Sequence, residues 1–301
     1  MFELRRLRLL HELALRGTIT DVARALSYSP STVSQQLALL EREAGAVLLE
    51  PDGRRVRLTA QGRLLADHAA RALELDEAVH VELSRTAEAP SLVRLAVMPT
   101  AAEAVVPRAL TVLAERHPDL RLEMVEMAPE EGLFELQAHA FDLVVAEQYP
   151  GYTRELRPGI DRTILGLDPI RLAVPLGESA SDLSELRDHA WALEPEGAAV
   201  RMWAVQQCRA AGFEPDVRFE ATDLIAHARL VEAGHAVAML PDLIWTGEQS
   251  RVRLVDLPGS PVREIFAASR TGSRDDPAIV AVRDALAETL AAHESPVNGR
   301  S

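Results

Sequence analysis

The chain has no lysine, a single cysteine and no apolar run near eighteen residues. One cysteine excludes an intramolecular disulfide and is typical of a reducing compartment. Neither a signal peptide nor a segment apolar enough to cross a membrane is visible, so we expect a cytoplasmic protein without a membrane partner. All 32 basic residues are arginine, a bias that points to a GC-rich coding sequence rather than to function.

Motifs of enzymes are also missing. The chain has no glycine-rich nucleotide loop, and Gly177–Ser181 resembles a nucleophile elbow but ends in serine where that motif has glycine. The nine histidines lack metal-ligand spacing, and His11-Glu12 lacks the second histidine of a zinc motif. Cys208 lies in a predicted helix, where we expect a small buried group. The sequence therefore predicts no enzymatic activity, no metal site and no cofactor.

Charge is unevenly distributed along the 301 residues. Residues 1–63 contain ten arginines against seven acidic residues, whereas the remainder contains twenty-two arginines against thirty-nine acidic residues. Exposed charges are screened beyond about 10 Å at moderate salt. The N-terminal part can therefore approach nucleic acid although the net charge is −14. The length suits a small domain joined to a larger one.

The segment Thr20–Leu58 predicts two short helices around a tight turn, followed by a hairpin. Thr20 is expected to cap the first helix, and Ser29 to cap a second helix that Pro30 opens. In the second helix, apolar residues recur at helical spacing and are expected to face inward: Val33, Leu37 and Leu40. The opposite face is polar and carries Ser31, Thr32, Ser34, Gln35 and Gln36.

Such a polar face has the side chains that a DNA-reading helix needs, because glutamine pairs with adenine and hydroxyls reach base edges or phosphates. An ordinary solvent-exposed helix face is the alternative. The segment that follows the helix favours the DNA-binding interpretation. Pro51-Asp52-Gly53 separates two β-prone runs, Val47–Leu49 and Arg54–Leu58, and predicts a hairpin turn. Arg54 and Arg55 at its tip can lie along the phosphates.

One long helix is expected to follow, opened by Thr59–Gly62. Leu58, Leu65, Ala72 and Val79 recur every seven residues, which is typical of a coiled-coil seam. We therefore predict that Leu65, Ala72 and Val79 mediate dimerisation. Packing of this helix on its own chain is the alternative. Pro90 ends the helix, and we place the domain boundary there.

From Leu92 onward, strands and helices alternate in two halves, as expected for sheets with helices on both faces. The expected strands are 92–98, 120–127, 141–146, 171–174, 217–221 and 235–240, and the expected helices are 104–117, 133–139, 183–188, 200–211 and 222–233.

In both its N-terminal and its C-terminal part, the chain resembles the LysR-type transcriptional regulators. The N-terminal resemblance lies in Thr18–Gly45 and Arg54–Gly62, although Leu49 and Pro51 stand where members usually carry Phe and Arg. The C-terminal resemblance lies in four further segments: Phe141–Glu147, Pro169–Pro175, Ala211–Pro215 and Ala221–Pro241.

The resemblance implies a fold class and a function. The fold is α/β with an N-terminal all-α winged helix-turn-helix, and the regulatory part is a two-lobe type 2 periplasmic-binding-protein-like α/β fold. The implied partners are double-stranded DNA at a palindromic promoter site, a small-molecule effector and further copies of the chain, as a dimer or a tetramer. The expected parts are a DNA-binding domain at 1–58, a linker dimerisation helix at 59–89, a regulatory domain at 91–292 and a disordered tail at 293–301. Lobe 1 comprises 91–165 and 264–292, and lobe 2 comprises 166–263.

In such folds, ligands bind at the carboxyl ends of strands and at helix N-termini. The effector residues expected on this basis are Thr100, Ala101, Gln148, Arg201 and Thr222. Thr222 is alternatively a helix cap, and Arg201 is either a carboxylate clamp or a surface arginine. A two-lobe solute-binding or biosynthetic protein with an unrelated helical cap is the competing class.

Overall fold

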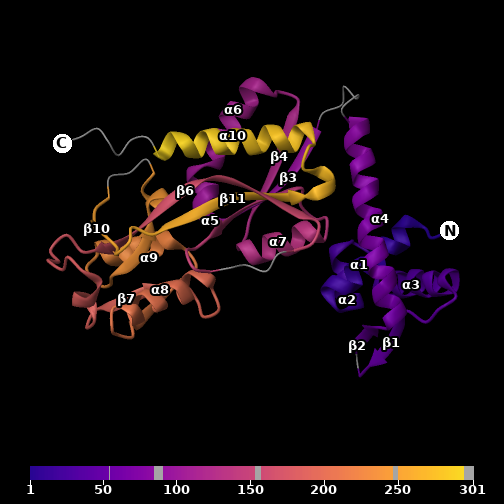
Figure 1. The fold of residues 1–301 in the computed structure, drawn as a ribbon, viewed down its shortest axis with the longest axis horizontal. Coiled ribbons are helices and arrows are strands. Elements are labelled where there is room, and N and C mark those ends of the chain that lie inside the picture. Colours follow the sequence, from indigo (N-terminus) through magenta and orange to yellow (C-terminus); the bar gives the residue numbers. More distant parts are fainter. Residues whose placement is uncertain (54, 85–90, 153–156, 247–249, 295–301) are drawn as a thin grey trace. The chain divides into compact units, whose positions relative to one another are not determined.

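The computed structural model describes residues 1–53, 55–84, 91–152, 157–246 and 250–294. They form two compact units (Figure 1). The first unit comprises Met1–Glu88 with Arg270–Asp276, and the second comprises Ala89–Ser269 with Pro277–Ser301.

The first unit contains the predicted helix-turn-helix, hairpin and long helix. Its elements are α1 (Leu4–Arg16), α2 (Ile19–Ala25), α3 (Pro30–Ala44), β1 (Leu49–Asp52), β2 (Arg55–Leu58) and α4 (Ala60–Ser84). Ser29 caps α3 as predicted, since its Oγ accepts the Thr32 N–H at 3.0 Å. The predicted Thr20 cap is wrong, because α2 starts earlier and Thr18 Oγ1 accepts the Asp21 N–H at 3.1 Å.

The inward face of α3 packs as its spacing predicts. Val33, Leu37 and Leu40 are buried in one hydrophobic cluster with residues of α1 and α2. Glu41, on the last turns of the same helix, accepts the backbone N–H groups of both Leu48 and Leu49 through Oε1. The orientation of α3 and the start of the hairpin are thereby fixed to the same core.

The hairpin turn is shorter than expected. Pro51 and Asp52 belong to β1, and Asp52 pairs with Arg55 of β2. Gly53 has φ of +61°, as two-residue hairpin loops commonly require. The predicted turn at Pro51-Asp52-Gly53 is therefore correct only for its glycine.

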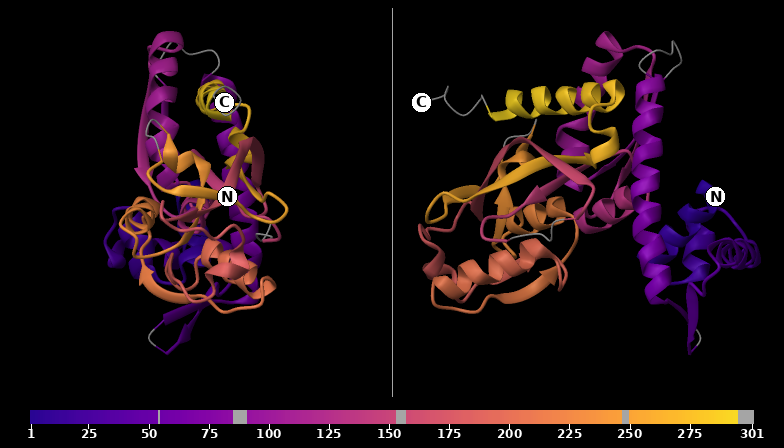
Figure 2. Two further views of the ribbon diagram at one scale, coloured as in Figure 1. Left: turned by 90° about the vertical axis from the view of Figure 1, so that its left-hand side faces the viewer. Right: turned by 45° about the vertical axis from the view of Figure 1, so that its right-hand side comes forward.

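Helix α4 is one long helix, as predicted, and Figure 2 shows it beside the hairpin. Thr59 caps it by accepting the Gly62 N–H at 3.0 Å. Gly62 lies against the hairpin so closely that a Cβ there would stand 2.1 Å from the backbone oxygen of Leu48. Only glycine fits this approach of helix and wing without a shift.

The second unit is an α/β fold with two lobes joined by long strands. Lobe 1 contains β3 (Ser91–Val97), α5 (Pro99–Ala104), α6 (Val106–Arg116), β4 (Leu120–Glu126), α7 (Pro129–Gln137), β5 (Leu143–Gln148) and α10 (Pro277–Glu294). Lobe 2 contains η1 (Leu183–Leu186), β7 (Ala190–Leu193), α8 (Ala199–Ala210), β8 (Asp216–Glu220), α9 (Leu224–Glu232), β9 (Ala238–Pro241), η2 (Asp242–Trp245) and β10 (Arg253–Asp256).

Two strands extend through both lobes: β6 (Ile160–Val174) and β11 (Val262–Arg270). The strand order is β10-β6-β11-β5-β3-β4, with β9 also paired to β6. Strand β11 pairs with β5 in lobe 1, whereas the end of β6 pairs with β9 and β10 in lobe 2. The two connections between the lobes, β6 and β11, are therefore continuous strands, which we call the crossover strands, and the predicted lobe borders at 165/166 and 263/264 lie inside them.

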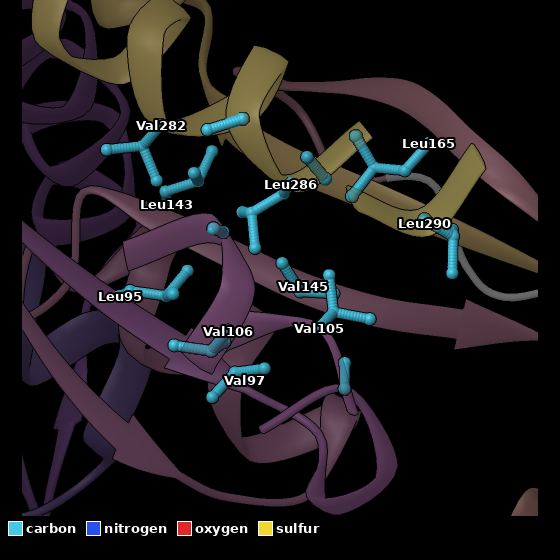
Figure 3. Close-up of a cluster of buried hydrophobic side chains, with 14 of the residues drawn as sticks. Leu95, Val97, Val105, Val106, Leu143, Val145, Leu165, Val282, Leu286 and Leu290 are labelled. Atoms are coloured by element: carbon cyan, nitrogen blue, oxygen red, sulfur yellow. The ribbon is translucent and has the colours of Figure 1, made fainter. Parts of the chain in front are cut away.

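Alternation along the strands of lobe 1 supplies two buried faces. Leu95, Val97 and Val145 point to the side of α6 and α10, and Figure 3 shows them in one cluster with Val106, Val282 and Leu286. The intervening residues, such as Ala96 and Val144, pack against α7 on the other side. Because side chains alternate along a strand, strands covered on both faces are apolar throughout.

Lobe 2 repeats this arrangement with different helices. Trp191 and Leu193 of β7 pack in the cluster that includes residues of α8, and the intervening Ala192 packs in the cluster that includes residues of α9. The predicted helix at 183–188 is a short 3-10 helix instead. Helix α10 continues to Glu294, so the predicted tail begins too early, and 295–301 lie outside the described residues.

Candidate functional site

The polar face of α3 is exposed over part of its predicted width. Ser31, Ser34 and Gln35 are exposed, and Thr32 is half-buried. Gln36 is turned toward α1, because its Oε1 accepts a hydrogen bond from Arg6 Nε at 3.0 Å. Its amide oxygen is thus used inside the fold, and the exposed reading face is narrower than the sequence predicts.

Hydroxyl groups gather at the start of α3. The Ser29 hydroxyl lies 2.8 Å from the Ser31 hydroxyl and 2.8 Å from that of Thr32. Thr20, although not a cap, is exposed in the first turn of α2. A helix N-terminus surrounded by hydroxyls can bind a phosphate group, because its first N–H groups have no partner within the helix.

The wing adds positive charge next to these elements in the chain. Residue 54 and the side chain of Arg55 lie outside the part of the chain that the structure describes, so their predicted phosphate contacts stay predictions. Arg57 is exposed and pairs with Glu50 across the hairpin at 2.6 Å.

The residues predicted to form a dimer seam on α4 differ in burial between the first and the second half of the helix. Leu65 is buried in the hydrophobic cluster of its own chain, and Ala72 packs against the same cluster. Leu65 is therefore a core residue, contrary to the prediction that it lies in a dimer seam, because α1 packs against this part of α4. Val79 is 52% exposed, and Leu75 and Leu83, one turn to either side, are also exposed.

Thr100 lies where the sequence predicts, at the N-terminus of α5 directly after β3, but its hydroxyl is already used. It is buried, and Arg263 Nη2 donates to its Oγ1 at 2.9 Å. Ala101 is fully buried in the core, so the prediction that it contacts a ligand is wrong. Gln148 is half-buried at the end of β5, and its Nε2 donates to the Tyr149 carbonyl at 3.4 Å.

Neither of the two effector residues predicted in lobe 2, Arg201 and Thr222, has the role that the sequence suggested. Arg201 donates to the Glu194 carbonyl at 2.9 Å and to the Glu220 carboxylate at 2.6 Å, so its guanidinium is not free to clamp a ligand carboxylate. Thr222 is exposed and is not the cap of α9. That cap is Asp223, which accepts the Ile225 N–H at 2.8 Å.

Arg263 is the central residue of this site, and it was not predicted from the sequence. It is 1% exposed, on the crossover strand β11, and its guanidinium pairs with Glu147 at the end of β5 and with Asp168 on β6. Asp168 also accepts the Leu243 N–H at 3.0 Å. A single arginine thus joins lobe 1 to both crossover strands. An arginine two residues before the apolar run Ile265–Ala268 was the available sequence signal.

Two further titratable groups are buried beside Arg263. Burial raises the pKa of Glu194, which follows β7, to about 7, and the charge of Glu147 acts in the same direction. Burial also raises the pKa of the Tyr149 hydroxyl well above its ordinary value. Buried carboxyl groups of this kind are common at functional sites.

A cavity of about 970 Å³ lies in the second unit, beside the end of α10, and shares Asp168 with the Arg263 network. Its lining includes Asp168, Arg171, Leu243, Trp245 and Leu290. None of the predicted effector residues lines it. Among the described residues, no cluster of three or more His, Cys, Asp or Glu side chains is arranged to hold a metal ion.

A winged helix-turn-helix with a long helix, joined to a two-lobed α/β unit, defines a transcription regulator with a sensing domain. Family models agree. The model described as "Bacterial regulatory helix-turn-helix protein, lysR family" matches residues 4–63, and the "LysR substrate binding domain" model matches residues 87–291. The chain belongs to the LysR family of DNA-binding transcriptional regulators with an effector-binding domain.

Curated relatives and solved structures are similar over most of the chain. A probable hydrogen peroxide-inducible genes activator of Mycobacterium avium is 30% identical, over 90% of this chain and 89% of that one. The transcriptional dual regulator GltC of Bacillus subtilis is 28% identical, over 80% and 81%. A full-length OxyR variant from Pseudomonas aeruginosa, with aspartate in place of a cysteine, is 19% identical with a TM-score of 0.68, over 95% of each chain.

These relatives are transcriptional regulators, not enzymes. Within the residues that the structure describes, no helix has the length and apolarity needed to cross a membrane.

Proposed function

We propose that this regulator reads DNA through the exposed face of α3, with Ser31, Ser34 and Gln35 toward the bases. The observation that carries the proposal is the orientation of the helix: its apolar face is fully buried, which leaves this polar face outward. The hydroxyls of Ser29 and Thr32 at the start of the helix suit a phosphate contact. Thr20 joins them as a candidate backbone contact, whereas Gln36 serves to hold α3 against α1.

A base-reading role for Gln35 has a measurable signature. Gln35→Ala should cost about 1–3 kcal/mol on the specific site and much less on random DNA, because a lost base contact removes discrimination. Gln61→Ala, an exposed glutamine of α4, is the matched control and should change neither affinity. Equal weakening on both DNAs in a gel-shift titration would assign Gln35 to the backbone instead.

We further propose that Arg54 and Arg55 contact phosphates from the wing. Replacing both with alanine should weaken binding to all DNA alike and reduce the slope of log affinity against log salt by roughly 0.9 per lost contact. Arg218→Ala, an exposed arginine of the second unit, should leave the slope unchanged. An unchanged slope for the wing variant would remove the wing from the interface.

For dimerisation, we propose a seam on the second half of α4, formed by the exposed side chains of Leu75, Val79 and Leu83. These side chains recur every four residues, which places them on one helix face. Such exposed apolar residues on a helix suggest a partner surface. A twofold dimer would in turn read a palindromic DNA site.

Substitution by charge separates this seam from the core. Val79→Glu should abolish the dimer in sedimentation and weaken operator binding, while the folded unit persists. His80→Glu adds a charge one residue further along and about 100° around the helix, and should leave the dimer intact. An intact Val79→Glu dimer would contradict the seam. Leu65→Glu should instead unfold the first unit, because Leu65 belongs to its core.

We propose that the signal is a small molecule bound between the two lobes, near Thr100, Glu147 and Arg263. The support is the convergence of buried polar groups from lobe 1 and both crossover strands. Peroxide chemistry, which the names of several relatives mention, is not extended to this chain. Cys208 is fully buried, and burial raises its pKa to about 12, whereas the reactive species is the thiolate.

A regulator without catalytic activity is the function that these residues support best. We infer a cytoplasmic location from the role alone, since the DNA that the regulator reads is there in bacteria. A gel shift of the full chain with its own upstream DNA tests the whole proposal. Absence of a specific complex would favour the solute-binding class instead.

A further inference from the structure

Both lobes line the cavity of about 970 Å³ beside the end of α10. Lobe 1 contributes Arg108 of α6 and Leu290 of α10. Lobe 2 contributes Trp245 of η2 and Leu254 of β10. Cavities of about 300–1,000 Å³ with a mostly apolar lining and a few polar groups are the usual form of small-molecule sites. The size and the lining of this cavity therefore suit a ligand.

The cavity is a different place from the proposed effector site. Arg263, at the centre of that site, does not line the cavity. Of Thr100, Glu147 and Asp168, whose side chains bind Arg263, only Asp168 does. A ligand in the cavity is therefore additional to the effector proposed above.

Three polar atoms of the lining are shielded from solvent and lack a hydrogen-bond partner among the described residues. They are Nε of Arg171, Nε1 of Trp245 and Oδ1 of Asp242. Arg171 and Asp242 pair with each other through Nη2 and Oδ2 at 2.9 Å, so these two unpaired atoms are the other ends of a formed ion pair. Buried polar atoms are nearly always hydrogen-bonded. Their grouping on one cavity indicates a ligand that carries hydrogen-bonding atoms.

The charges of the lining favour a negatively charged ligand. Asp242 is neutralised by Arg171, and Asp168 pairs with Arg263 at 2.8 Å. Arg108, by contrast, is exposed and has no ionic or hydrogen-bonding partner among the described residues. The lining thus has one arginine without a counter-ion, and each of its carboxylates already has an arginine.

Most of the remaining lining is aliphatic. It includes Leu167, Leu243, Leu254 and Leu290 together with Pro169. Burial of alkyl groups against such side chains is favourable in proportion to the area removed from water. The ligand that fits has an apolar body next to its charged group.

We propose that this cavity is a second ligand site and that it binds an amphipathic carboxylate, with the carboxylate on Arg108 and an alkyl chain against the leucines. Arginine pairs with carboxylates through two parallel hydrogen bonds. A carboxylate only accepts hydrogen bonds, and two of the three unpaired atoms, on Arg171 and Trp245, are donors. Because both lobes line the site, the ligand favours the arrangement of the lobes in which it contacts both.

Probes that share one chain length test the charge. Isothermal titration of the full-length protein with octanoate, 1-octanol and octylamine compares an anion, a neutral molecule and a cation on the same alkyl chain. Octanoate should bind at least about tenfold more tightly than either of the others. Butyrate has the same charge on a shorter chain and should bind at least about tenfold more weakly than octanoate, because it buries fewer methylene groups.

Two exposed arginines of lobe 1 supply a matched pair of variants. Arg108→Gln should weaken binding of octanoate at least about tenfold and leave binding of 1-octanol unchanged, because it removes the charge and keeps most of the side chain. Arg121→Gln removes the same charge from a side chain of β4 that is 73% exposed and does not line the cavity. It should change the affinity for octanoate less than about twofold.

Two neighbouring alanines locate the alkyl chain. Ala291 and Ala292 are both exposed on α10, and only Ala292 lines the cavity. Ala292→Trp should weaken binding of octanoate at least about tenfold, because the indole occupies part of the cavity. Ala291→Trp adds the same bulk outside it and should leave the affinity unchanged.

Several outcomes would overturn the proposal: no binding of octanoate, binding of 1-octanol or octylamine as tight as that of octanoate, equal effects of the two arginine variants, or octanoate binding that Ala292→Trp leaves intact. None of them bears on the reading of DNA, which the gel shift tests separately.

Discussion

Replacing Glu194 with glutamine should make the protein more stable at neutral and alkaline pH. Burial is the first cause of the raised pKa of this carboxyl, and the charge of Glu147 adds to it. Glutamine keeps the shape and carries no charge. The variant therefore removes the cost of ionising a buried group.

The magnitude follows from the change in pKa. The folded protein holds the proton with a pKa of about 7, against an ordinary value of 4.5. The folded state therefore binds more protons than the unfolded state between these values, and this carboxyl makes the wild type lose stability as pH rises through that window. At about 1.4 kcal/mol per pKa unit, the loss between pH 5 and pH 8 is about 2.5 kcal/mol. Above pH 8 the loss is complete.

Urea denaturation followed by tryptophan fluorescence measures this loss in the right part of the molecule, because Trp191, Trp203 and Trp245 all lie in lobe 2. The quantity to compare is the difference in unfolding free energy between variant and wild type, in which contributions from other titrating groups largely cancel. That difference should grow by about 2.5 kcal/mol from pH 5 to pH 8 for Glu194→Gln. A difference that stays constant with pH would refute the buried, proton-binding carboxyl. The exposed Glu196→Gln should give a flat line.

Three further results are expected. Gly62→Ala should destabilise the first unit by about 1–3 kcal/mol in thermal unfolding, since its Cβ would meet a backbone oxygen at 2.1 Å, whereas Gly177→Ala, with open space around it, should be neutral. Thr18→Ala should cost about 1 kcal/mol of stability and Thr20→Ala clearly less, and the reverse order would restore the cap predicted from sequence. Cys208 should resist a thiol reagent in the native protein and react only after denaturation, and rapid native labelling would show it to be accessible.

Local patterns predicted those parts of the molecule whose cause is local. The period of Val33, Leu37 and Leu40 placed α3 and its buried face, and Ser29 with Pro30 placed its start. The long helix α4 and the alternation of strands and helices after it follow in the same way. The cap of α2 could not be predicted in this way, because Thr18 and Thr20 are both suitable residues and the start of the helix decides between them.

The seam of α4 shows where periodicity stops being sufficient. A seven-residue repeat fixes which face of the helix is apolar, but it is silent on what covers that face. In the structure, α1 packs on the first half, so Leu65 is a core residue while Val79 remains exposed. The sequence could not show that Leu65 is buried and Val79 exposed, since both residues occupy the same position of the repeat.

The candidate effector site depended most on the tertiary structure. Sequence pattern determined that a strand ends near Thr100 and that a helix begins there, because both depend on neighbouring residues. Only the folded chain decided that the Thr100 hydroxyl is taken by Arg263, 163 residues away, and that Glu194 is buried. Hydrogen bonding and burial of charge at this site depend on contacts between lobes, and no local pattern in the sequence encodes which residues the crossover strands bring together.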